Sequence, residues 1–186
     1  GDLFGAVAAT VDRHVLGELD PIACTPQLGR PGLWSDRLPH FRMSEMPSSG
    51  EEIQSEYLLP HRHAIGAIDA IRALAEEIQP ILLVSEIRRV AADRLWMSTS
   101  YEQDSVAFHF TWKREPEAVQ EMIARIEDAL TLFEARPHWG KVFHAGAAAI
   151  AGLYKHHSDF VGLVERLDPR GAFRNAWLKA RVFGDR

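Results

Sequence analysis

Residues 106–112 read VAFHFTW and give the clearest secondary-structure signal in the chain. Large apolar side chains alternate there with Ala107, His109 and Thr111. This period of two predicts a strand that packs one face against a core. Because the aromatic face must be covered by another layer, His109 and Thr111 are expected to project together from the opposite face of the sheet.

Segments on both sides of this strand predict the other elements of one domain. Residues 53–59 and 81–88 are predicted strands, and residues 61–78 and 115–134 carry apolar residues at helical spacing. A short extended piece is expected at 139–143. The order predicts an α+β fold of the ferredoxin-like split βαβ type, with a mostly antiparallel sheet and both helices on one face. The other face would then be uncovered.

The two ends of the chain give weaker signals. Val7, Val11 and Val15 are four residues apart, a weak helical pattern. Residues 21–50 are rich in proline and glycine and show no period, which predicts an irregular arm. Near the other end, a last helix is expected to begin at Ser158, a good N-cap, and to end at Asp168-Pro169.

The composition narrows the classes of function. The 186 residues carry a formal net charge of −5 and include no strongly basic stretch. No nucleic-acid partner is therefore expected, because phosphate binding needs a surface rich in lysine and arginine. Cys24 is the single cysteine, which excludes an internal disulfide and fits a reducing compartment. Neither a signal-peptide pattern nor an apolar run of ~20 residues is present. A cytoplasmic location is expected, with membrane association left open.

Two pairs of polar residues mark the predicted strands. Glu86 and Arg88 are two residues apart, as are His109 and Thr111, so each pair projects from one face of its strand. In the split βαβ order all four side chains would share the face away from the helices. They form either a binding surface or an ion pair beside a structural histidine, and the pattern leaves both interpretations open.

A third cluster, residues 136–141, reads RPHWGK. Basic residues at the end of a helix often compensate its dipole, which explains Arg136 well but explains Lys141 poorly. The histidines within 61–63 and at 156–157 lack a cysteine or carboxylate cluster at the usual spacing, so no metal site is predicted. The sequence also lacks a glycine-rich phosphate loop, and therefore shows no nucleotide-binding motif of its own.

Nine segments together carry a resemblance to a known family. They are residues 24–27 (CTPQ), 31–34 (PGLW), 37–42 (RLPHFR), 55–60 (SEYLLP), 86–88 (EIR), 109–112 (HFTW), 136–141 (RPHWGK), 167–169 (LDP) and 173–176 (FRNA). They resemble the C-terminal part of the alditol (xylitol) oxidases, which are grouped with the D-arabinono-1,4-lactone and L-gulonolactone oxidases among the vanillyl-alcohol-oxidase-type flavoproteins. The match is specific because Glu-x-Arg, His-x-Thr and His-Trp-Gly-Lys occur together in the family's order. RLPHFR and HFTW favour the sugar-alcohol branch.

The resemblance implies an FAD-dependent oxidase. In such enzymes a carbinol carbon of a polyol gives a hydride to flavin N5, and oxygen reoxidises the flavin to yield hydrogen peroxide. Arg88 and Lys141 would supply positive charge for the developing alkoxide and the reduced flavin. Lys141 and Trp139 would contact the cofactor.

The resemblance also implies how the substrate is held. Glu86 would orient Arg88 and accept hydrogen bonds from substrate hydroxyls, while His109 and Thr111 would hold further hydroxyls. The proton acceptor stays open between Lys141, His109 and a water beside Arg88.

On this basis residues 1–50 are expected to be a linker and irregular arm, and residues 51–186 the C-terminal substrate (cap) domain. Nothing in the sequence resembles the family's N-terminal FAD-binding domain, and this domain is expected to be a missing partner. Without it, the chain is expected neither to retain FAD nor to catalyse the reaction. The uncovered sheet face is expected to be hydrated or to pair with another copy. Two alternatives remain: an aldonolactone oxidase, and a non-catalytic ferredoxin-like binding domain.

Overall fold

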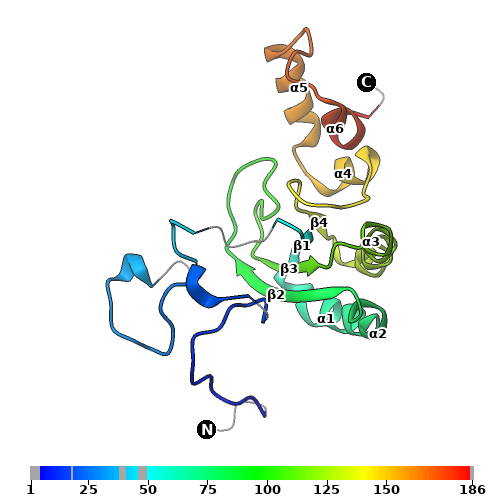
Figure 1. Ribbon diagram of the computed structural model, residues 1–186. Helices are drawn as coiled ribbons and strands as arrows, with labels where there is room; N and C mark the ends of the chain where they lie inside the picture. The colour runs from blue at the N-terminus through cyan, green and yellow to red at the C-terminus, as the bar shows by residue number, and fades with distance from the viewer. Residues whose placement is uncertain (1–4, 18, 38–40, 46–49, 185–186) are drawn as a thin grey trace. The chain divides into compact units, whose positions relative to one another are not determined.

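The computed structural model describes residues 5–17, 19–37, 41–45 and 50–184. The chain divides into two compact units, Gly1–Glu52 and Ile53–Arg186. The second unit contains a sheet with helices and is drawn from cyan to red in Figure 1.

Four strands form the sheet of the second unit. In sheet order they are β2 (Leu82–Val90), β3 (Ser105–Trp112), β1 (Ile53–Pro60) and β4 (Arg136–Pro137). Every neighbouring pair is antiparallel. This is the strand order of the split βαβ arrangement, and the prediction of an α+β fold with an antiparallel sheet is confirmed.

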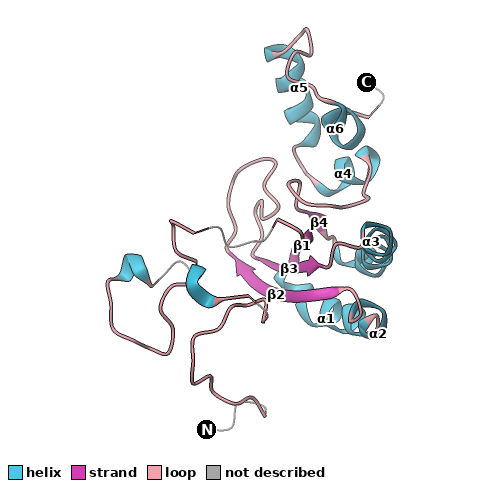
Figure 2. Cartoon of the chain, in the orientation of Figure 1, coloured by secondary structure: helices cyan, strands magenta, loops and turns pink. Residues whose placement is uncertain are grey.

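The helices that follow β1 and β3 lie on the same side of the sheet (Figures 1 and 2). They are α1 (Ala64–Arg72), α2 (Ala75–Ile78) and α3 (Pro116–Leu130). The segment predicted as one helix at 61–78 is divided: it opens with a 3₁₀ turn at His61–His63 and is interrupted between α1 and α2. Pro116 occupies the first turn of α3, where a missing N–H leaves no helical hydrogen bond unmade.

The aromatic face of β3 forms the core with these helices. The buried residues of α3 are Val119, Met122, Ile123, Ile126 and Leu130. Trp112 is completely buried, stacks on Phe110 with ring centroids 5.1 Å apart, and donates from Nε1 to Ser55 Oγ at 3.0 Å. This packing fixes which face of the sheet remains for the polar side chains.

The last strand differs from the prediction. The extended piece expected at 139–143 is not a strand, because β4 contains only Arg136–Pro137. The chain nevertheless stays beside β1, since His138 N donates to Glu56 O and Val142 N donates to Gln54 O, both at 2.9 Å. Between these two bonds the backbone closes a turn.

The C-terminal helices were only partly predicted. The Ala-rich helix α4 (Ala147–Leu153) was missed, because Ile150 is its one buried residue and no apolar stripe marks it. Helix α5 spans His157–Leu167 with His156 at the N-cap, so the predicted start at Ser158 is wrong. A further helix, α6 (Ala176–Leu178), was not predicted.

The first unit consists mostly of loops. It contains 3₁₀ turns at Pro21–Ala23 and Trp34–Asp36 and an isolated bridge between Cys24 and Phe41. The helix suggested by the valines is wrong: residues 5–17 contain no helix, and Val7 is almost fully exposed. A short helix without a surface to pack on is marginal in water.

In the part of the chain that the structure describes, no helix has both the length and the apolar character that a membrane crossing requires.

Candidate functional site

Strand register places polar side chains in one row across the sheet. His109 on β3 stands opposite Glu56 on β1 and opposite Glu86 on β2. Directly paired residues share a face, and the large aromatic residues of β3 occupy the helix-covered face. The row therefore lies on the face away from α1 and α3, where Arg88 and Thr111 also project by the two-residue period.

Lys141 reaches this row from the turn that follows β4. Lys141 N donates to His138 O at 3.1 Å, which closes a turn over residues 138–141. The hydrogen bonds of His138 and Val142 to β1 hold the two ends of this turn against the sheet. A Cβ at position 140 would lie 3.2 Å from the ring of His138, whose exposed side chain would have to shift slightly to admit it.

The side chains of the row form a connected network. Lys141 Nζ lies 2.5 Å from Glu56 Oε2 and 2.7 Å from His109 Nδ1. Arg88 Nη2 donates to Glu56 Oε1 at 2.9 Å, and Arg88 Nη1 lies 3.8 Å from Glu86 Oε2. His109 Nε2 lies 3.1 Å from Thr111 Oγ1. The structure thus brings together five predicted residues: Glu86, Arg88, His109, Thr111 and Lys141.

The expectation that this sheet face is uncovered is wrong for its centre. Glu56, His109 and Thr111 are buried. By contrast, the side chains of Glu86 and Arg88, on the edge strand β2, are 44% and 46% exposed. A ligand would therefore reach this network from the β2 edge, where one anion and one cation are accessible.

Glu56 is the central residue that the sequence analysis missed. It lies in the segment 55–60 that contributed to the resemblance, but no role was assigned to it. One signal was available: Glu56 lies in the middle of a predicted strand, and a carboxylate there is seldom buried unless it is paired. Its partners could not be identified from spacing, because Lys141 is far away in sequence.

The environment of Glu56 keeps its carboxylate ionised. Burial by itself raises the pKa of this group. Hydrogen bonding with Lys141, together with the positive charges of Lys141 and Arg88, outweighs burial and holds the pKa of Glu56 well below its ordinary value. The site is therefore built around a buried negative charge that two cations compensate.

Glu56 is expected to make the stability of the chain depend on pH. Its pKa is lower in the folded chain than the ordinary value of 4.5, so its contribution is fully present above pH 4.5 and is lost as the pH falls toward about 2. A pKa difference of this size corresponds to a contribution of about 3 kcal/mol to the free energy of unfolding. Urea unfolding between pH 6 and pH 3 should show a larger loss of stability on acidification for the wild type than for Glu56→Gln. Parallel curves for the two proteins would contradict this contribution.

Two other residues of the 136–141 cluster point elsewhere. Trp139, predicted to contact the cofactor, packs against Tyr154 and Trp177 with ring centroids 5.9 Å and 5.7 Å away. Arg136 donates from Nε to Leu153 O at 3.0 Å and from Nη1 to Thr99 O at 3.2 Å. It therefore connects β4 with the loop between β2 and β3. Trp139 is not part of the hydrogen-bonded network around Glu56, and its contact with a cofactor stays a prediction.

Of the four histidines within 61–63 and at 156–157, three have side-chain hydrogen-bond partners within the protein: His63, His156 and His157. His63 Nε2 lies 3.4 Å from Glu134 Oε1, and His156 Nδ1 lies 2.7 Å from Asp159 Oδ2. Among the described residues, no three His, Cys, Asp or Glu side chains form a group that could hold a metal ion.

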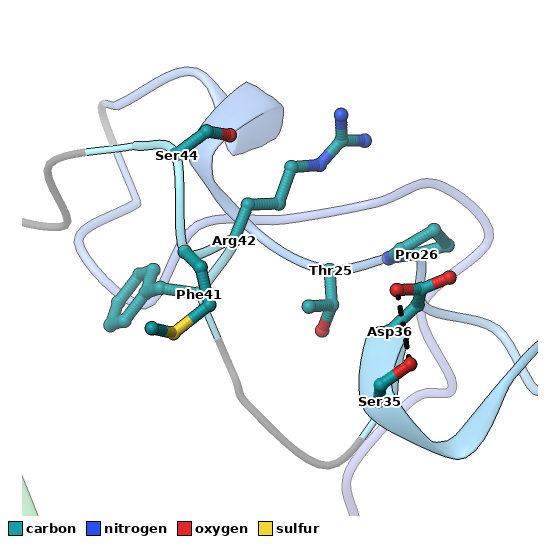
Figure 3. A pocket seen from close by; sticks show the side chains of 8 residues that line it. Thr25, Pro26, Ser35, Asp36, Phe41, Arg42 and Ser44 are labelled. Carbon is teal, nitrogen blue, oxygen red and sulfur yellow. Dashed lines mark hydrogen bonds between the residues drawn. The ribbon is translucent and has the colours of Figure 1, made fainter.

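A separate hollow of about 480 Å³ lies within the first unit (Figure 3). Its lining includes Thr25 and Arg42, from two of the segments that carried the resemblance, although residues 38–40 of one segment are outside the described residues. Ser35 and Asp36 also line it, and the Ser35 hydroxyl donates to Asp36 Oδ1 at 3.5 Å. The hollow contains no group of titratable side chains comparable to that around Glu56.

Comparison with known proteins identifies a family and several relatives of the chain. A family model described as D-arabinono-1,4-lactone oxidase matches residues 43–181. Alditol oxidase of Streptomyces sp. (strain IKD472 / FERM P-14339) is 47% identical over 183 residues, and the match covers 98% of this chain and 44% of that protein. L-gulono-1,4-lactone dehydrogenase of Mycobacterium tuberculosis is 30% identical over 134 residues, which cover 70% of this chain and 30% of that protein. The chain therefore spans less than half the length of these relatives.

Proposed function

The chain belongs to the D-arabinono-1,4-lactone oxidase family, and on that premise we propose that it is the substrate-side part of an FAD-dependent oxidase acting on a polyol. The substrate is a xylitol-like alditol whose primary alcohol is oxidised, with oxygen as the electron acceptor. The similarity to an alditol oxidase over nearly the whole chain supports the polyol assignment.

The observation that carries this proposal is the pairing of two cations on one buried carboxylate. Lys141 and Arg88 each bind one oxygen of Glu56, so both are held by a common anchor. Preorganised positive charge of this kind stabilises an oxyanion that develops in a reaction, because no reorganisation is needed at that moment. An alcohol that loses its hydroxyl proton develops such a negative charge on its oxygen.

The exposed groups of the site suit a chain of hydroxyls. Arg88 offers only donors, whereas the carboxylate of Glu86 offers only acceptors. Both lie on the accessible β2 edge, so one hydroxyl could accept from Arg88 while another donates to Glu86. This pairing orients a polyol along the edge of the sheet.

Lys141 serves this site as a positive charge. Its Nζ lies 2.5 Å from an ionised carboxylate, an arrangement that favours the ammonium form. An ammonium group has no lone pair, so Lys141 in this state does not take the hydroxyl proton. The proton acceptor is then a water beside Arg88, because the accepting nitrogen of His109 is occupied by Lys141 at 2.7 Å.

The residues of the network fit one end of FAD. The cofactor, when bound, supplies the atom that accepts the hydride and passes the electrons to oxygen, giving hydrogen peroxide. The donor set at Lys141 and Arg88 matches the negative charge of a reduced flavin ring. Many pyrophosphate sites use a glycine-rich loop that opens a helix, and the sequence contains no such motif. We therefore assign the phosphate end of the cofactor to a separate FAD-binding domain.

An aldonolactone substrate is the second candidate. The family description and the similarity to an L-gulono-1,4-lactone dehydrogenase favour it. A lactone ring presents the same carbinol chemistry in a cyclic frame, and the charged row would hold its hydroxyls in the same way. The two substrates therefore differ in shape rather than in the chemistry required.

A substrate panel tests the proposal. The intact flavoprotein, incubated with oxygen and with xylitol, sorbitol, D-arabinono-1,4-lactone or L-gulono-1,4-lactone, is expected to release peroxide fastest with a linear polyol. Faster turnover of a lactone would establish the second candidate. An FAD-loaded protein that released no peroxide with any of the four would exclude both and favour a binding domain.

A further inference from the structure

Glu56 links the two cations of the site through separate oxygens. Oε2 accepts from Lys141 Nζ at 2.5 Å, and Oε1 accepts from Arg88 Nη2 at 2.9 Å. The cations come from different elements: Arg88 is on strand β2, whereas Lys141 is in the turn after β4. Because the Glu56 side chain is only 8% exposed, water has little access to replace either bond.

The same contacts determine the direction of hydrogen bonding beyond Lys141. Its ammonium group only donates, so His109 Nδ1, 2.7 Å from Nζ, must be the acceptor. A neutral imidazole with an accepting Nδ1 carries its proton on Nε2, which then donates to Thr111 Oγ1 at 3.1 Å.

A cationic His109 bonded directly to Glu56 is the competing arrangement. His109 Nδ1 lies 3.5 Å from Glu56 Oε2, which is longer than its 2.7 Å distance to Lys141. A protonated Nδ1 would also direct its hydrogen at an ammonium group. Both the distance and the charge therefore favour Lys141 as the donor to Nδ1.

From this geometry we propose that Glu56 is a positioning residue of the site, which holds Lys141 and Arg88 at a fixed separation and, through Lys141, sets His109 in its Nε2–H tautomer. The proposal rests on the proposed function, because the reaction is what the two cations are positioned for. Glu56 acts through its neighbours and is not itself the group that contacts the substrate.

A purely structural role for Glu56 makes a different prediction. If the side chain only filled space, glutamine would replace it well because the two have almost the same shape. Glutamine, however, has one accepting oxygen and a donating NH₂ group. It can accept from Lys141 or from Arg88, but it presents a donor to the other cation and carries no charge to offset either.

The first experiment measures the tautomer of His109 in the chain itself. In ¹⁵N-histidine-labelled protein near neutral pH, His109 is expected to show a protonated Nε2 and an unprotonated Nδ1. Glu56→Gln and Lys141→Met should both release Nδ1 and give a mixture of tautomers. Glu134→Gln, which removes an exposed carboxylate paired with Arg62, should leave the His109 signals unchanged.

The second experiment measures flavin reduction in the intact flavoprotein. Glu56→Gln is expected to slow reduction by about 10- to 100-fold, since a displacement of ~1 Å at a reacting centre can cost as much as ~10²-fold. Glu56→Asp retains the charge and should recover part of that rate. Glu134→Gln should react at the wild-type rate.

The outcomes separate this proposal from the proposed function. A protonated Nδ1 on wild-type His109, or unchanged tautomer and rate in Glu56→Gln, would overturn the positioning role. If Glu56→Gln does not fold, Lys141→Met tests the tautomer and Glu56→Asp tests the rate. A protein that oxidises no alcohol would refute the proposed function, while the tautomer measurement would still decide how Glu56 acts on His109.

Discussion

Replacing Lys141 by alanine in the FAD-dependent oxidase proposed above is expected to slow flavin reduction by about 10²–10³-fold, the usual effect of removing one preorganised charge or donor at a reacting centre. Lys141 Nζ contacts both Glu56 and His109, and its side chain is only 16% exposed. The substitution removes the charge and also frees two buried partners. No neighbouring lysine among the described residues of the row could take its place.

Stopped-flow measurement of flavin reduction under anaerobic conditions isolates this effect from reoxidation by oxygen. Lys155→Ala is the matched control, because Lys155 is 65% exposed and pairs with Glu102 away from the network. The control should reduce its flavin at the wild-type rate. Reduction of Lys141→Ala at near-native speed would rule out the assigned role, provided that thermal unfolding shows an intact fold.

The second large effect concerns the fold. Trp112→Ala is expected to lower the free energy of unfolding by about 3–5 kcal/mol, as deletion of a buried aromatic side chain leaves a cavity. Trp112 is completely buried, stacks on Phe110, and gives its N–H to the buried Ser55 hydroxyl. The substitution therefore removes packing and leaves Ser55 without this donor.

Guanidinium unfolding followed by far-UV circular dichroism measures this loss without depending on tryptophan fluorescence. Trp34→Ala provides the control, because Trp34 is 75% exposed. It should change the free energy of unfolding by no more than about 0.5 kcal/mol. A loss below about 1 kcal/mol for Trp112→Ala would show that this strand does not face the core.

Much of the candidate site followed from the two-residue period of the strands. The alternation at 106–112 assigned the aromatic residues to the core and therefore His109 and Thr111 to the opposite face. The same rule placed Glu86 beside Arg88. Face assignment is a local property of an extended backbone, so a single sequence is sufficient to predict it once the strands are recognised.

The position of Lys141 depended on interactions between residues that are far apart in the sequence. The sequence predicted an extended piece at 139–143, but the structure has a turn there whose ends bond to β1. The turn directs Lys141 toward Glu56. The ends of the turn are held by backbone hydrogen bonds to β1. That strand lies far away in the sequence: Lys141 and Glu56 are 85 residues apart.

By itself, the sequence determined the class of fold and which polar residues share a sheet face. Both follow from the periodicity of apolar residues within each segment and from the order of the segments along the chain. The tertiary structure alone decided the strand register that sets Glu56 opposite His109, the burial of that carboxylate, and its pairing with cations from β2 and from the turn after β4. It also decided that the valines near the N-terminus form no helix. The physical reason is common to these cases: the energy of a charge or an apolar side chain depends on what surrounds it in space, and those surroundings come from distant parts of the chain.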